Sequence, residues 1–149
     1  MRLILAVLLA LTIHAHASIG TDNHNPGNIR SWHPNVWAGA VGVDRWHHLR
    51  FAADEDGIRA MRRVLRAYNH KGVRTVAGIV NRWVGPKHGT VAILAVRGYL
   101  LRVAKDMGTT GQIDLSDNEV MGRLAKSIIY AENGVQPYPE SVFRKIFRY

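Results

Sequence analysis

The stretch N-P-G-N-I-R, residues 25–30, decides how the rest of this sequence is interpreted. A Pro-Gly pair forms a tight turn, and the side chains of Asn25, Asn28 and Arg30 place hydrogen-bond donors and acceptors at its rim. No packing need accounts for these side chains together, which favours a polar loop that holds a ligand. The alternative is a turn that only connects two elements.

The residues after this loop predict a small sheet followed by helices. Residues 27–51 carry short apolar and aromatic pieces broken by glycines and by Pro34, which is typical of an irregular hairpin or sheet. From Glu55 the apolar spacing is helical, with acidic residues at the start of the segment and Gly72 after its end. Two further helices are expected, from Thr75 to Trp83 and from Thr90 to Met107.

The last long helix is predicted from a capping box at residues 116–119, in which Ser116 and Glu119 satisfy the first amide donors. An apolar face follows and the helix ends at Asn133-Gly134, which leaves Glu132 in the final turn. The carbonyl end of the helix dipole repels a carboxylate there and favours the protonated form. A protonated carboxyl group suits general acid catalysis.

Elimination among the glutamates also selects Glu132. Glu119 is explained by the capping box, Glu55 complements the dipole in the first turn of its helix, and Glu140 lies in a polar tail segment. Glu132 alone lacks a structural explanation. The alternative is that it is a surface glutamate at a helix end, which is a common arrangement.

The first seventeen residues have the layout of a secretory signal peptide. Residues 3–13 form a short apolar run after Arg2, and residues 15–17 form an A-x-A site. We expect cleavage after Ala17, with the alternative that the run stays as a slowly released membrane anchor. Residues 18–149 then form one domain in the periplasm or cell envelope, without a stable membrane span.

The composition of the chain indicates which class of partner to expect and whether a metal or cofactor is expected. The chain has 20 Lys and Arg residues against 11 Asp and Glu, so an anionic polymer is the expected partner. Cysteine is absent and the histidines lack metal-ligand spacing, so neither a metal nor another cofactor is expected. A monomer is expected, and no motif for specific nucleic-acid binding is present.

The order of several motifs resembles a group of small phage and prophage proteins with a lysozyme-like, lytic-transglycosylase-like fold. The motifs are N-P-G-N-I-R, Trp37 with Gly39, F-A-A-D-E-D-G-I-R-A at 51–60, Tyr68 with K-G-V-R-T at 71–75, R-W at 82–83, and A-E-N-G with P-Y at 131–138. The resemblance covers almost all of residues 18–149. It implies an α+β fold that is mainly α, with a small N-terminal hairpin or sheet and four to five helices. Because the E-N-G helix end lies near the C-terminus, the resemblance further implies that the order of these motifs is circularly permuted.

The resemblance implies cleavage of the peptidoglycan bond between N-acetylmuramic acid and N-acetylglucosamine, by an endolysin, a virion-associated enzyme or a wall-remodelling protein. Glu132 would be the catalytic acid and base, giving either a 1,6-anhydro product or hydrolysis. Asn25, Asn28 and Arg30 would form the opposite wall of the sugar cleft. Trp32 and Tyr138 would stack on sugar rings, and Trp32 is expected to be exposed because polar residues surround it.

One departure from the family pattern favours a different function. Where relatives tend to carry acidic and amide residues after R-W-A-P, this chain has Lys87, His88 and Gly89. A catalytically silent peptidoglycan-binding or virion structural protein is therefore the main alternative. A cationic protein that binds nucleic acid or membranes is a third hypothesis, disfavoured by the export signal before a well-patterned domain.

Overall fold

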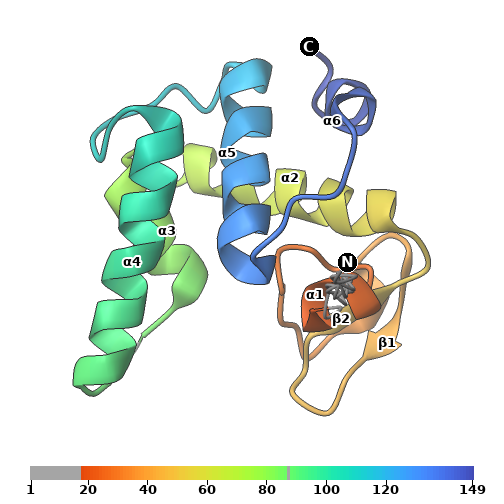
Figure 1. The fold of residues 1–149 in the computed structure, drawn as a ribbon. Coiled ribbons are helices and arrows are strands. Elements are labelled where there is room, and N and C mark those ends of the chain that lie inside the picture. Colours follow the sequence, from red (N-terminus) through yellow and green to blue (C-terminus); the bar gives the residue numbers. More distant parts are fainter. Residues whose placement is uncertain (1–17, 87) are drawn as a thin grey trace, which may run out of the picture.

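The structure, a computed structural model, describes residues 18–149 except residue 87. It confirms an α+β fold that is mainly helical with one small antiparallel sheet (Figure 1). The predicted signal peptide and Lys87 lie outside the described residues. The elements are α1 (Ile19–Asp22), the 3-10 helix η1 (Pro34–Val36), β1 (Ala40–Val43), β2 (Leu49–Phe51), α2 (Asp54–His70), α3 (Val76–Val84), α4 (Thr90–Met107), α5 (Asn118–Asn133) and α6 (Glu140–Phe147).

The main core lies where α2, α5 and α6 meet, with α3 and α4 on one side and the sheet beyond the other end of α2 (Figure 1). The predicted apolar stripe of α2 supplies Ile58, Met61 and Leu65, all fully buried, and α5 supplies Leu124 and Ile128. Within the described residues, no helix is long and apolar enough to cross a membrane.

The start of α5 differs from the predicted capping box, which is wrong. Asp117 is the N-cap, and its Oδ1 accepts hydrogen bonds from the amides of Glu119 at 2.8 Å and Val120 at 3.2 Å. The Ser116 hydroxyl instead donates to Asp114 Oδ1, so it is engaged in the turn before the helix. The predicted end is confirmed, since Gly134 adopts the left-handed conformation with φ of 73°.

Helix α6 differs from the sequence prediction, which places a polar tail segment at residues 139–141. The segment after Pro139 places Phe143, Ile146 and Phe147 on one face, at the i, i+3 and i+4 spacing of a helix. Both phenylalanines are fully buried and their ring centroids lie 6.2 Å apart. The short helix α1 was also not predicted; Ser18 caps it through a hydrogen bond from the amide of Thr21.

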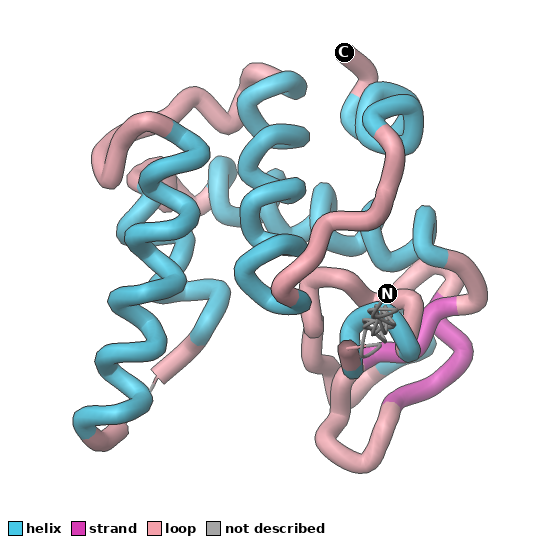
Figure 2. The backbone as a smooth tube through the Cα atoms, viewed as in Figure 1, coloured by secondary structure: helices cyan, strands magenta, loops and turns pink. Residues whose placement is uncertain are grey.

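The sheet pairs β1 with β2 in an antiparallel register, with Val43 opposite Leu49 and a β-bulge between Ala40 and Gly42. An isolated bridge between Arg30 and His48 continues this pairing into the N-P-G-N-I-R loop. Leu49 and Phe51 are buried in a second, smaller apolar cluster. Figure 2 shows the loop and strands beside the C-terminal end of α5. The sheet therefore fixes the loop close to the turn that contains Glu132.

Candidate functional site

A cavity of about 650 Å³ lies between the N-P-G-N-I-R loop and the helices. The loop, the end of α3, the middle of α4 and the last turn of α5 all contribute to its wall. The lining residues are Gly27, Asn28, Ile29, Arg30, Trp37, His48, Val64, Tyr68, Trp83, Val84, Gly85, Pro86, Tyr99, Ala131 and Glu132. Aromatic walls with a few converging polar groups are typical of a ligand site.

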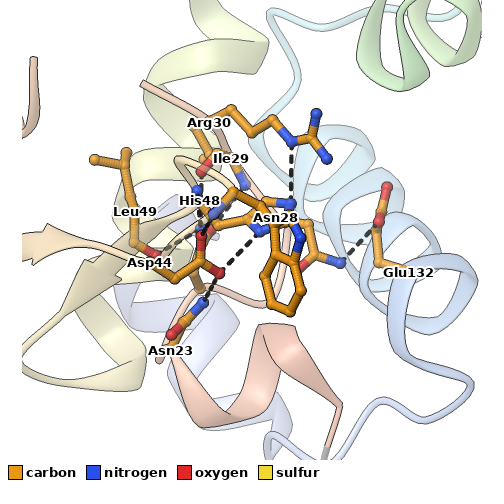
Figure 3. A network of polar contacts seen from close by, with 10 residues as sticks. Asn23, Asn28, Ile29, Arg30, Asp44, His48, Leu49 and Glu132 are labelled. Atoms are coloured by element: carbon orange, nitrogen blue, oxygen red, sulfur yellow. Dashed lines mark hydrogen bonds and ion pairs between the residues drawn. The ribbon is translucent and has the colours of Figure 1, made fainter. Parts of the chain in front are cut away.

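Asn28 and Glu132 meet directly across this cavity. The side-chain amide of Asn28 donates a hydrogen bond to Glu132 Oε2 at 3.0 Å, although the two residues are 104 positions apart (Figure 3). The expectation that the loop and the glutamate face one another is therefore confirmed. The last turn of α5 aims the carboxyl group into the cavity beside Ala131.

Tyr99 of α4 holds the other oxygen of the same carboxyl group. Its hydroxyl donates to Glu132 Oε1 at 3.1 Å. Burial, together with the negative charge of Glu132, raises the pKa of Tyr99 far above its ordinary value. The hydroxyl consequently keeps its proton at neutral pH and stays a hydrogen-bond partner of Glu132.

Asn25 shapes the loop and does not face the cavity. Its side chain is fully buried, and its amide nitrogen donates to the carbonyls of Ile29 and Leu49, both at 2.9 Å. Its amide oxygen accepts from the backbone N–H of Ile29 at 3.0 Å. These bonds use the polar atoms that a sugar would need, so Asn25 positions the loop. The interpretation of Asn25 as a cleft-wall residue that contacts sugar is corrected accordingly.

Two more contacts attach the loop to the helices. The indole N–H of Trp83 donates to the carbonyl of Gly27 at 3.1 Å, and Asn133 donates to the carbonyl of Pro26 at 2.7 Å. A Cβ at Gly27 would lie only 2.8 Å from the Trp83 ring, so this close approach requires glycine. Asn133 also accepts a short hydrogen bond from Ser18, which joins the end of α5 to α1.

Asn28 combines an unusual backbone conformation with a buried polar atom that lacks a hydrogen-bond partner within the described part of the chain, and both features cost stability. Its backbone has a φ of 48°, in the left-handed region that residues other than glycine rarely adopt. Its side-chain oxygen is buried and has no hydrogen-bond partner among the described residues. Strained backbone and unpaired buried polar atoms concentrate at functional sites, where the geometry itself is needed. This cost is consistent with a loop built to present the Asn28 amide to Glu132.

Arg30 reaches the cavity at the end of a three-residue chain of hydrogen bonds. Its Nε donates to His48 Nε2 at 3.0 Å, and His48 Nδ1 lies 2.9 Å from Asp44 Oδ2 (Figure 3). Because the guanidinium only donates, His48 Nε2 accepts. Nδ1 therefore carries the hydrogen and donates a hydrogen bond to Asp44. Arg30 makes no ion pair within the described part of the chain, so its terminal nitrogens can bind an anionic group.

Asp44 anchors this chain as an ionised group. Burial raises its pKa, but hydrogen bonds from His48, from the amide of Trp46 and from Asn23 outweigh burial and hold the pKa well below its ordinary value. The carboxylate also caps the turn between β1 and β2 through the amides of Trp46 and His48. Arg30 is thus positioned by the sheet and not by its own loop alone.

The structure does not bring Trp32 and Tyr138 to the cavity wall. Trp32 is 74% exposed, as expected, and stacks on His47 with ring centroids 3.6 Å apart. Tyr138 packs beside the core, where burial and the nearby charge of Asp54 raise its pKa to about 12. Trp37 and Trp83 are the tryptophans that line the cavity.

Sequence reasoning missed the roles of Tyr99, His48 and Asp44. Tyr99 lies in an apolar helix, where an aromatic residue is typical of a core position, and no spacing connects it to Glu132. The Asp44–His48 spacing of four residues falls in a turn, so the helical rules did not reveal it. The signal that links Arg30 to His48, and through it to Asp44, is the pairing of Arg30 with His48 across the extended hairpin.

Glu132 is the sole carboxylate among the described residues that line the cavity. Within the described part of the chain, no group of three or more His, Asp or Glu side chains is arranged to hold a metal ion. No protein-family model matches this chain, and no curated protein matches it.

Proposed function

We propose that this chain is an exported enzyme that cleaves the β-1,4 bond between N-acetylmuramic acid and N-acetylglucosamine in peptidoglycan, with Glu132 as the single acid and base. The observation that carries the proposal is the 3.0 Å contact between Asn28 and Glu132 inside a 650 Å³ cavity. The motif order that resembles lytic-transglycosylase-like proteins supplies the reaction class. The basic composition suits an acidic polymer substrate.

The reaction needs one carboxyl group that first gives up a proton and then takes one. Glu132 would protonate the glycosidic oxygen as positive charge develops on the muramoyl ring, and the resulting carboxylate would then act as base. The Tyr99 hydroxyl is suited to both states, because a hydroxyl can donate to the carboxylate and accept from the acid. The Asn28 amide donates to Oε2 in either state and fixes the orientation of the group.

The remaining lining residues match a glycan that carries carboxyl groups. Trp37, Tyr68 and Trp83 offer aromatic surface on which pyranose rings pack. Arg30, fixed through His48, is placed to bind the lactyl or peptide carboxylate of muramic acid. Trp32 is exposed outside the cavity, where it could stack on a sugar farther along the strand.

The presence of a single carboxylate among the described lining residues favours the 1,6-anhydro product. Hydrolysis with two carboxyl groups would need a second acid facing Glu132, and the described lining residues include none. Attack by the muramoyl 6-hydroxyl needs only the one base. Release of 1,6-anhydromuramoyl ends is therefore the expected outcome, and hydrolysis by an activated water is the alternative product of the same site.

The experiment compares the parent protein with Glu132→Gln on purified peptidoglycan, followed by mass spectrometry of the soluble fragments. Glu119→Gln is the matched control, since it makes the same chemical change in the first turn of the same helix and far from the cavity. We expect anhydromuramoyl fragments from the parent and from Glu119→Gln, and a loss of about 100-fold or more in Glu132→Gln. Equal release by the parent and Glu132→Gln would contradict the assignment of Glu132.

The second candidate function is a catalytically silent protein that binds peptidoglycan through the same cavity. The sequence change at residues 87–89 favours it, because Gly85 and Pro86 immediately before that segment line the cavity. This candidate predicts that neither the parent nor any variant releases fragments, while the parent still sediments with the wall. Substitution of Arg30 by Gln would then weaken sedimentation without any effect on release.

A further inference from the structure

The outward face of α4 carries an apolar stripe that the rest of the described chain leaves uncovered. Val91, Leu94, Gly98, Leu101 and Lys105 follow one another at offsets of three and four residues, so they lie on one side of the helix. All of them are exposed, Val91 by 83% and Leu101 by 60%. Figure 1 shows α4 along one edge of the molecule.

Beside the stripe, a second cavity of about 760 Å³ lies between α3 and α4. Its apolar wall comes from Ile93, Val96 and Leu100, and its polar rim includes Arg82 and Arg97. None of the described residues that line it is acidic. The stripe and this groove together form a surface, here called the α4 face, in which apolar side chains are flanked by arginines and a lysine.

The positive charge of the sequence is concentrated in the segment from α2 to α4, with six basic residues in α2 and the turn after it and five from Arg82 to Lys105. Residues 57–105, which include most of α2 and all of α3 and most of α4, contain 11 of the 20 Lys and Arg residues and none of the 11 Asp and Glu. The rest of the chain therefore has 9 basic and 11 acidic residues. The whole formal net charge of +9 thus originates from this one segment.

We propose that the α4 face docks on the surface of an anionic lipid membrane. Exposed apolar side chains can enter the boundary between headgroups and acyl chains, while the flanking cations bind lipid phosphates. A second copy of this chain does not fit as the occupant, because two acid-free surfaces would repel each other. Nucleic acid would be bound by the cations, but Leu94 and Leu101 would then be left against phosphates with no apolar partner.

This docking is independent of the proposed reaction, although it would affect where the reaction occurs. Gly85 and Pro86 line both the α4 groove and the cavity of Glu132, so the two sites are adjacent. A molecule bound through α4 would hold the mouth of that cavity near the membrane surface. Glycan strands close to the membrane would then be the first to reach it.

The first test measures co-sedimentation of the full chain with vesicles of phosphatidylglycerol and phosphatidylethanolamine, and with vesicles of phosphatidylcholine alone. The variant is Leu94→Gln with Leu101→Gln; because both side chains are exposed, folding should be retained and is checked by thermal unfolding. The matched control is Val41→Gln with Val135→Gln, which likewise replaces two exposed aliphatic side chains by Gln, at positions away from α4. Residues 1–17 are the same in every protein, so differences in binding report the substituted positions.

We expect the Leu94 and Leu101 double variant to bind anionic vesicles about 10-fold more weakly than the parent, and the control to bind as the parent does. Binding that is equal in the parent and the α4 variant would overturn the proposal. Equal affinity of the parent for neutral vesicles would overturn it as well, since the charge argument would fail. A dimer that dissociates on substitution of Leu94 and Leu101 would identify a second copy as the occupant instead.

A second measurement detects insertion directly and uses the absence of cysteine. Leu94→Cys and, as a control, Val41→Cys give chains with one thiol each, which are labelled with a polarity-sensitive fluorophore. We expect anionic vesicles to raise the emission and shift it to the blue for the label at position 94 and not at position 41. No change at position 94 on vesicle-bound protein would contradict docking through α4, whatever the activity of Glu132.

Discussion

The helical part of the molecule and the N-P-G-N-I-R loop are stabilised in different ways. Helices α2, α5 and α6 are joined by fully buried apolar side chains such as Ile58, Leu124 and Phe143. The loop instead depends on hydrogen bonds from side-chain amides, with Asn25 inside it and Asn133 outside it. Apolar packing tolerates small shifts, whereas hydrogen bonds fix atoms to within tenths of an ångström. The site thus lies where the hydrogen-bonded loop meets the apolar helical region.

The largest effect on stability is expected in the helical core. Phe143→Ala removes a fully buried ring that stacks on Phe147, and should lower the free energy of unfolding by about 3–5 kcal/mol. Urea denaturation measures this, with the exposed Val135→Ala as control. A loss no greater than that of the control would show that α6 does not belong to the core.

Asn25→Ala tests whether side-chain hydrogen bonds stabilise the N-P-G-N-I-R loop. The substitution leaves the backbone N–H of Ile29 without its partner and removes one hydrogen-bond donor from the carbonyls of Ile29 and Leu49. It should lower the free energy of unfolding by about 2–3 kcal/mol. The exposed Asn35→Ala is the matched control, with an expected change within about 0.5 kcal/mol. If both variants unfold at the same urea concentration, the loop does not depend on Asn25.

Gly27→Ala should push the loop away from the helices, with a smaller loss of stability than Asn25→Ala. The new methyl group would meet the Trp83 ring at 2.8 Å and Met61 Cγ at 2.9 Å, which should cost about 1–3 kcal/mol. Gly98→Ala makes the same change on the exposed face of α4, where nothing lies within 4 Å, and should stabilise the chain by up to about 1 kcal/mol. Changes of the same sign in both variants would contradict the close approach at Gly27.

The smallest expected effect depends on pH and concerns Asp44. Because its folded pKa lies below the ordinary value, ionised Asp44 stabilises the fold above about pH 4, and this stabilisation is lost as the pH falls toward the folded pKa. The gap in stability between the parent and Asp44→Asn should therefore be widest near pH 7 and shrink below about pH 4. Urea midpoints at several pH values measure the gap. If the difference in stability stays constant with pH, the hydrogen bonds from Asn23 and His48 do not depend on the charge of Asp44.

The sequence predicted the helical region more completely than the site. Apolar periodicity and glycine ends were enough for α2, α4 and α5, because those signals are local. The capping residue of α5 was wrong by one position, and α6 was missed because eight residues give little periodicity. At the site, Glu132 and Asn28 were predicted to face each other, and they do. Tyr99 was not predicted, since its contact with Glu132 depends on how two helices cross, which no local pattern encodes.

The proposed reaction requires that Glu132 performs chemistry in a cavity that the loop completes. The most direct measurement follows binding and release together, by adding Glu132→Gln to purified peptidoglycan and determining both the bound protein and the soluble fragments. We expect that Glu132→Gln sediments with the wall as the parent does and releases almost no fragments, while Glu119→Gln matches the parent in both. Fragment release by Glu132→Gln at the parent's rate would contradict the claim.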